Sequence, residues 1–72
     1  MTTHELSAEL KRRYQTASKR EVALTIHLFG IEFADKLVGH RLAEIAEAGT
    51  GYKSYDVEIR KGMRLAKFVR VR

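Results

Sequence analysis

The sequence predicts an all-α fold, a small bundle of four to five helices. Apolar residues recur at helical spacing through most of the chain, there is no proline, and glycine-bearing segments separate the helical stretches. With 72 residues, the chain is expected to form one domain over 1–72. A chain of this size buries about 60% of its unfolded surface. Since it has no cysteine, helix packing or a partner subunit must supply its stability.

The first predicted helix covers residues 3–17. One face of this helix carries the apolar residues Leu6, Leu10, Tyr14 and Ala17. Thr2 and Glu5 have the spacing of a capping box, in which each side chain accepts the other residue's backbone N–H. A second capping box is expected at Ser18 and Glu21, where the next helix would begin.

Residues 22–38 form the most apolar stretch and are predicted to be the central buried element. The stretch is either one helix or a pair broken at Gly30, because glycine costs about 1 kcal/mol relative to alanine inside a helix. His27 is expected to be a hydrogen-bonded core histidine. The same segment is a candidate surface for a homodimer.

Residues 40–48 are predicted to form a short amphipathic helix that ends at the GTG sequence, residues 49–51. Ser54 is the predicted N-cap of a further helix that runs to Lys61 and stops at Gly62. The final FVRVR sequence favours a short strand or an extended tail, because β-branched residues alternate with arginine.

An alternative interpretation makes residues 55–72 a β-hairpin, since apolar residues also alternate along this stretch. The hairpin would then be a wing, and residues 40–48 would be the recognition helix.

Positive charge is concentrated in the last third of the chain. Residues 1–48 contain seven Lys/Arg and seven Asp/Glu, whereas residues 49–72 contain seven Lys/Arg and two Asp/Glu. The whole net charge of +5 therefore comes from the last third. Such a field favours a polyanionic partner, and the alternative is a solvated basic tail.

Residues 42–65 have the layout of a helix-turn-helix: a short helix with small inner residues, a glycine-bearing turn, and a second helix with a polar outer face. Tyr55 and Ile59 would hold the second helix against the core. The candidate DNA-binding residues on and around its outer face are Tyr52, Lys53, Ser54, Val57, Arg60, Lys61, Arg64, Lys67 and Arg70.

These candidates have different expected roles. Arg60 and Arg64 are the predicted base contacts, because guanidinium groups donate to guanine O6 and N7, and Val57 suits a thymine methyl group. Residues 52–54 could reach phosphates, helped by the N-terminus of the second helix. Further phosphate contacts are expected from Lys53, Lys61, Lys67, Arg70 and Arg72.

The motif LAEIAEA…KSY…EIRKG resembles the helix-turn-helix of bacterial and phage DNA-binding regulators, over about a third of the chain. The resemblance places Ala46 at the small residue of the first motif helix and residues 54–62 on the recognition helix. Thr50 stands where glycine is usual, and Asp56 where an apolar residue is common. The segment IHLFGIEFADKL also resembles a set of small HTH-like bacterial proteins. The resemblance implies a regulator of transcription that binds double-stranded DNA, sequence-specifically or structurally.

Other classes of function have little support in the sequence. The three histidines are far apart, and there is no cysteine, phosphate-binding glycine loop or nucleophile elbow, so no enzyme, metal site, cofactor or small-molecule substrate is expected. No apolar run approaches the roughly 20 residues that span a bilayer, so a cytoplasmic protein without membrane contact is expected. The alternative functions are RNA binding, or a helical protein-interaction module whose basic end meets an acidic partner.

Overall fold

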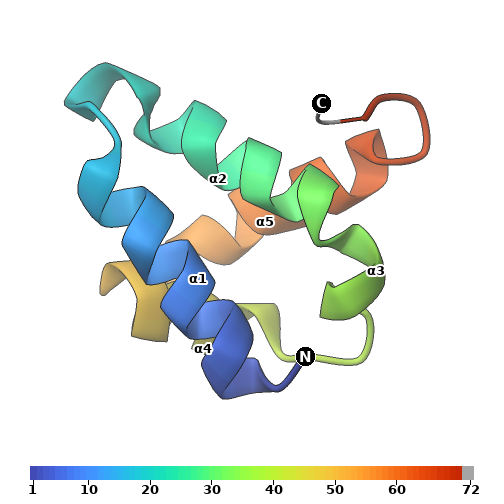
Figure 1. The fold of residues 1–72 in the computed structure, drawn as a ribbon, viewed down its shortest axis with the longest axis horizontal. Helices are drawn as coiled ribbons and strands as arrows, with labels where there is room; N and C mark the ends of the chain where they lie inside the picture. The colour runs from blue at the N-terminus through green and yellow to red at the C-terminus, as the bar shows by residue number, and fades with distance from the viewer. Residues whose placement is uncertain (71–72) are drawn as a thin grey trace.

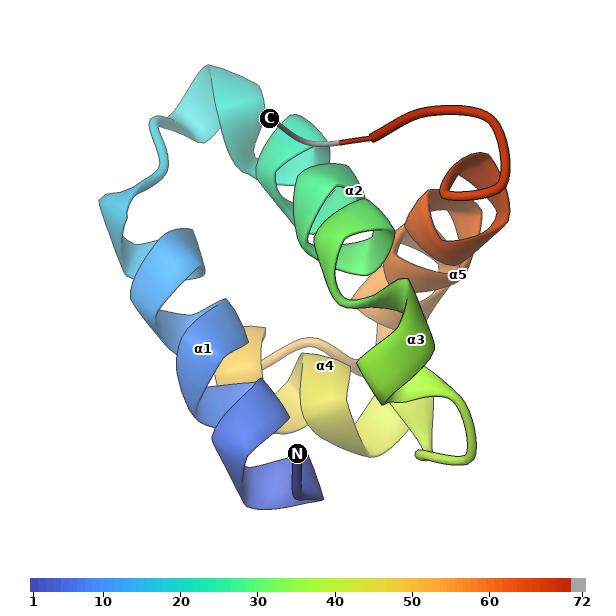
Figure 2. The ribbon, with the colours of Figure 1, turned by 45° about the vertical axis from the view of Figure 1, so that its right-hand side comes forward.

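The helices pack in two crossing pairs (Figure 1). The computed structural model describes residues 1–70, where the helix that begins the chain lies against the fourth helix and the second lies against the fifth. A single helical turn and a loop lead from one pair to the other (Figure 2). The helices are α1 (Thr3–Thr16), α2 (Val22–Glu32), α3 (Ala34–Leu37), α4 (Leu42–Thr50) and α5 (Asp56–Leu65). The all-α prediction is confirmed.

One cluster of buried apolar side chains draws on every one of these helices. Burying a large apolar side chain contributes about 1.5–3 kcal/mol, so this shared core holds the two pairs together. Its members are Leu6, Leu10, Ile26, Phe29, Leu37, Leu42, Ile45, Ala46 and Ile59.

The first helix begins as predicted. The Glu5 backbone N–H donates to Thr2 Oγ1 at 3.0 Å, and the Thr2 backbone N–H donates to Glu5 Oε1 at 2.8 Å. The hydrogen bond from the Thr2 backbone lowers the pKa of Glu5. Leu6 and Leu10 are fully buried, which confirms the predicted inner face of α1.

The second predicted capping box, at Ser18, is wrong. The Glu21 backbone N–H donates to the main-chain oxygen of Ser18 at 3.0 Å, while the Ser18 hydroxyl lies 3.4 Å from the Glu21 carboxylate. This main-chain bond closes a 3-10 turn, η1 (Lys19–Glu21), which precedes α2.

The apolar segment is a broken pair of helices, but the break lies at Phe33 and Gly30 is inside α2. The segment is also less buried than predicted, because Leu24 is 51% exposed and Leu28 is 38% exposed. α2 therefore has an apolar face in solvent as well as one in the core.

Gly30 lies in α2 because that helix meets α5 backbone to backbone. A Cβ atom on Gly30 would overlap the Ile59 main-chain oxygen and lie 3.0 Å from Gly62 Cα. A Cβ atom on Gly62 would overlap the His27 main-chain oxygen and lie 2.9 Å from Gly30 Cα. The predicted stop at Gly62 is therefore wrong: this glycine permits close packing inside α5, which continues to Leu65.

The connection between α4 and α5 also differs from its prediction. α4 continues through Gly49 to Thr50, and Gly51 ends it with a φ of 88°. Ser54 is not an N-cap, because it lies within a second 3-10 turn, η2 (Lys53–Tyr55), and α5 begins after Tyr55.

The β-hairpin alternative is wrong, because its first half is the helix α5. Residues 66–68 form turns, residues 69–70 are irregular, and no strand occurs up to Arg70. The i→i+4 bonds of α5 satisfy the backbone groups that a hairpin would have paired. The last two residues of the predicted strand, 71–72, lie outside the described residues, as does the phosphate contact expected from Arg72. No helix within residues 1–70 has the length and apolar character needed to cross a membrane.

Candidate nucleic-acid interface

The turn between α4 and α5 is closed by the hydroxyl of Thr50. This hydroxyl donates to the Ala46 main-chain oxygen at 2.7 Å and accepts the Tyr52 backbone N–H at 3.1 Å. The Gly51 backbone N–H donates to the Glu47 main-chain oxygen at 2.8 Å. These bonds satisfy main-chain polar groups at the end of α4 and fix the direction of the chain toward α5.

Aromatic packing holds the start of α5 against α1. The ring centroid of Tyr55 lies 6.2 Å from that of Tyr14 and 6.0 Å from that of Tyr52. Such spacings are typical of stabilising aromatic pairs. Tyr55 is half-buried and Ile59 is fully buried, so the predicted inner side of α5 is confirmed.

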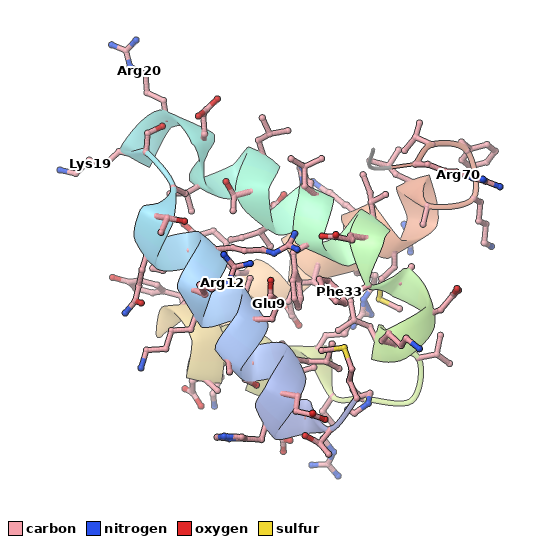
Figure 3. The ribbon with its side chains drawn as sticks, in the orientation of Figure 1. Glu9, Arg12, Lys19, Arg20, Phe33 and Arg70 are labelled. Carbon is pink, nitrogen blue, oxygen red and sulfur yellow. The ribbon has the colours of Figure 1, made fainter. Side chains whose placement is uncertain are left out.

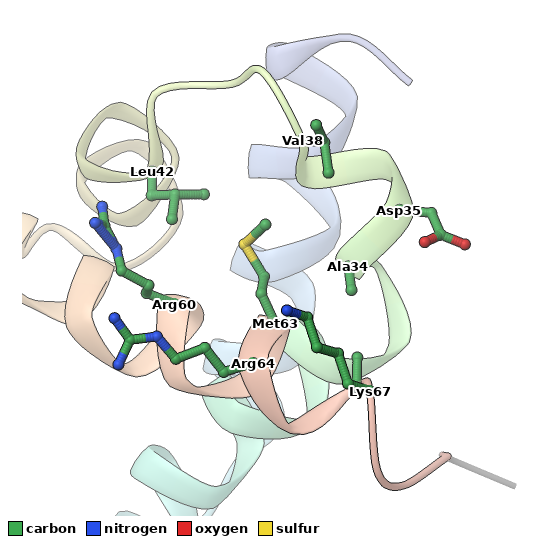
Figure 4. Close-up of a pocket in the computed structure, with 9 residues that line it drawn as sticks. Ala34, Asp35, Val38, Leu42, Arg60, Met63, Arg64 and Lys67 are labelled. Atoms are coloured by element: carbon green, nitrogen blue, oxygen red, sulfur yellow. The ribbon is translucent and has the colours of Figure 1, made fainter.

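The opposite side of α5 faces solvent. Val57 is 51% exposed, and the side chains of Arg60, Lys61 and Arg64 are exposed as well. Tyr52, Lys53 and Ser54 precede α5 and are exposed too. Arg60 and Arg64 extend from neighbouring turns of α5 in Figure 4, and Lys67 lies in the turn that follows the helix.

Arg70 does not belong to this group. It lies beyond the turn that follows α5, at the end of the described chain (Figure 3). There it lines a separate hollow with Ile31, Glu32 and Val69. Of the nine predicted contact residues, the structure thus places seven on η2, α5 and the turn that follows, with Tyr52 directly before η2, and separates Arg70 from them.

Few acidic groups offset these cations. Arg60, Arg64 and Lys67 have no ion-pair partner within residues 1–70, and Lys61 Nζ lies 3.9 Å from Glu58 Oε1. Asp56 occupies the first turn of α5, where the helix dipole favours a carboxylate. The exposed side of α5 is therefore a cationic surface.

Glu58 also contacts α2. Its Oε2 contacts His27 Nε2, and the two side chains are 23% and 27% exposed. His27 is hydrogen-bonded as predicted, but its predicted place in the core is wrong, because it is half-buried at the edge of the α2–α5 contact and lies outside the core cluster. Sequence reasoning missed Glu58 as its partner, because nothing local relates residues 31 positions apart.

Comparison with known families identifies the chain. Residues 2–72 match a family described as an HTH-like domain. The chain belongs to the HTH-like domain family. No curated protein and no solved structure matched it. The match covers the whole helical core and supports a helix-turn-helix domain that binds DNA in general.

Proposed function

We propose that this HTH-like protein is a transcription regulator of the bacterial cytoplasm, acting by binding double-stranded DNA and not as an enzyme. The observation that carries the proposal is the row of exposed cations on α5, two of which, Arg60 and Arg64, have no ion-pair partner within residues 1–70, in a chain that matches the HTH-like family. An α-helix fits the major groove, and α5 is the helix whose outer side is cationic.

In the proposed complex, the outer side of α5 enters the major groove. Arg60 and Arg64 donate to guanine O6 and N7, and Val57 contacts a thymine methyl group. Residues 52–54 meet the phosphate backbone at the start of α5, while Lys61 and Lys67 contact phosphates farther along the duplex.

We further propose that two copies act together on paired half-sites, because one small module gives limited affinity. The exposed Leu24 and Leu28 are one helical turn apart on α2 and offer an apolar contact surface. Changing both to aspartate should turn a dimer into a monomer in sedimentation analysis while the helical circular dichroism is kept. Identical sedimentation of the variant and the unmodified protein would contradict this surface.

The DNA proposal is tested by neutralising one cation before α5 and one on it. Lys53→Gln combined with Arg60→Gln should weaken binding to a mixed-sequence duplex by about tenfold or more, because each charged contact contributes on the order of 1 kcal/mol or more. Fluorescence anisotropy of a labelled duplex at fixed salt measures the change.

The chain offers a matched control. Lys19→Gln combined with Arg20→Gln removes the same two residue types from the turn before α2, where both side chains project into solvent (Figure 3). The control should bind like the unmodified protein. Equal losses in both variants would mean that net charge alone matters, and no loss in the first would refute the assignment to α5.

The same assay separates the two rival partners. Tyr52 is 59% exposed beside Lys53 and could stack on an unpaired base, whereas Tyr55 is packed against Tyr14. Single-stranded RNA that displaces the duplex at lower concentration than unlabelled duplex would favour RNA. Displacement by an acidic protein but not by nucleic acid would favour the interaction module.

A further inference from the structure

A groove with one apolar wall lies where α3, the start of α4 and the end of α5 meet (Figure 4). Its volume is about 500 Å³, which is within the range of pockets that hold small molecules. The apolar wall consists of Ala34, Val38, Leu42 and Met63. Val38 is 71% exposed and Leu42 is buried, so the part of this wall that a ligand reaches most readily is Val38.

The other side of the groove is cationic. Arg60, Arg64 and Lys67 line it, and none of the three has an ion-pair partner within residues 1–70. Asp35 is the acidic residue of the lining, and its carboxylate points away from the three cations in Figure 4. The groove is therefore complementary to a molecule with an apolar body and an anionic end.

We propose that this groove binds a small amphipathic carboxylate. The hydrocarbon body lies against Val38, Leu42 and Met63, where its burial removes apolar surface from water. The carboxylate lies among Arg60, Arg64 and Lys67, and a guanidinium group can hold it with two parallel hydrogen bonds.

The ligand site shares three residues, Arg60, Arg64 and Lys67, with the proposed DNA surface. A carboxylate bound by Arg60 and Arg64 removes the guanidinium groups that would otherwise contact the duplex. Ligand and DNA then exclude each other, so the carboxylate acts as an effector that releases the protein from DNA. This consequence rests on the proposed function, whereas ligand binding itself does not.

Binding is tested without DNA, by titrating the isotope-labelled protein with octanoate below its micelle concentration and recording backbone amide spectra. Saturable shifts should cluster at Val38, Leu42, Met63 and Lys67. The uncharged analogue 1-octanol should bind more weakly by about fivefold or more, because it lacks the charge that the cations recognise.

Two variants carry one added carboxylate each. Val38→Asp places it on the apolar wall and should weaken octanoate binding by about fivefold or more. Ala8→Asp places it on the exposed side of α1, outside the groove, and should leave octanoate binding unchanged. Both positions are exposed, so both variants should keep the thermal unfolding midpoint within a few degrees.

Absence of saturation, shifts spread over all exposed apolar residues, equal binding of 1-octanol, or equal affinities of the two variants would each overturn the site. For the coupling, octanoate at about ten times its dissociation constant should raise the apparent Kd for duplex DNA by about tenfold, and acetate at the same concentration should not. Saturation of the groove with no change in duplex affinity would overturn the coupling.

Failure of the protein to bind duplex at all would refute the proposed function. The proposal that the groove binds a carboxylate would be unaffected, because its test uses no DNA.

Discussion

Glu9 illustrates how single residues join α1 to α2. Its carboxylate lies 2.5 Å from Arg12 Nη2 and 2.9 Å from Arg13 Nε. Arg13 in turn contacts the carboxylate of Glu32 and lies 5.0 Å from the ring centroid of Phe33. Figure 3 shows Glu9 and Arg12 beside each other on α1, with Phe33 nearby. One carboxylate thus orients the arginine that bridges the two helices.

The hydrogen bond from Arg12, followed by the one from Arg13, lowers the pKa of Glu9 below its ordinary value of 4.5. A carboxyl group whose pKa is lowered by folding stabilises the protein above its unfolded pKa, and that contribution is lost as the pH falls through its folded pKa. Glu9→Gln should therefore lower the free energy of unfolding at pH 7 and reduce the loss of stability on going to pH 3.

Urea unfolding at several pH values measures the effect of Glu9→Gln. Glu47→Gln serves as the control, because Glu47 is exposed on α4 and forms no ion pair within residues 1–70. Parallel pH profiles for the Glu9 variant and the unmodified protein would contradict the role assigned to this carboxylate.

At the scale of whole elements, the two sides of α5 differ in what they contact. Its inner side contains Ile59 and Gly62 and fits against α2, whereas its outer side carries Arg60 and Arg64. The close approach at Gly62 leaves no room for a methyl group without moving one helix backbone.

The sign of the stability change caused by Gly62→Ala tests this packing. Helix propensity alone would make alanine more stable than glycine by about 1 kcal/mol, but overpacking costs about 1–3 kcal/mol. We expect a net loss of stability in chemical denaturation. Arg64→Ala, at an exposed position of the same helix, should change stability by less than about 0.5 kcal/mol. A Gly62 variant as stable as the unmodified protein would mean that the helices separate easily.

The sequence was sufficient to predict that helices occur and which side of α1, α4 and α5 is buried, because apolar spacing reports burial directly. It was insufficient at the glycines. In the sequence, Gly30 and Gly62 resemble helix breaks. Their actual role, close packing between α2 and α5, depends on a helix that is distant in the chain and cannot be predicted locally. Ser18 and Ser54 read as caps, but main-chain 3-10 bonds closed those turns instead.

Over the whole molecule, part of the charge asymmetry seen in the sequence becomes a cationic surface on α5, which carries Arg60, Lys61 and Arg64. The sequence indicated most of the candidate contacts, because exposed positions on a helix follow from its buried ones. It could not indicate the separation of Arg70, the contact between His27 and Glu58, or the groove beside Met63, since these depend on how distant segments meet.

The salt dependence of duplex binding measures how many of these cations meet phosphates. The logarithm of affinity should fall linearly with the logarithm of salt concentration, by about 0.9 per phosphate contact. If Lys53 and Arg60 both meet phosphates, neutralising both should reduce the slope by about 1.8. If only Lys53 does and Arg60 reads a base, the reduction should be nearer 0.9, with a relaxed sequence preference. An unchanged slope would mean that neither side chain lies near the backbone of the duplex.

The glycine contact between α2 and α5 has a consequence for the outer side of α5. Because main-chain atoms make that contact, it asks nothing of the solvent-facing positions 57, 60 and 64. The chemistry of the outer side of α5 can therefore change while the packing of α5 on α2 beneath it stays the same.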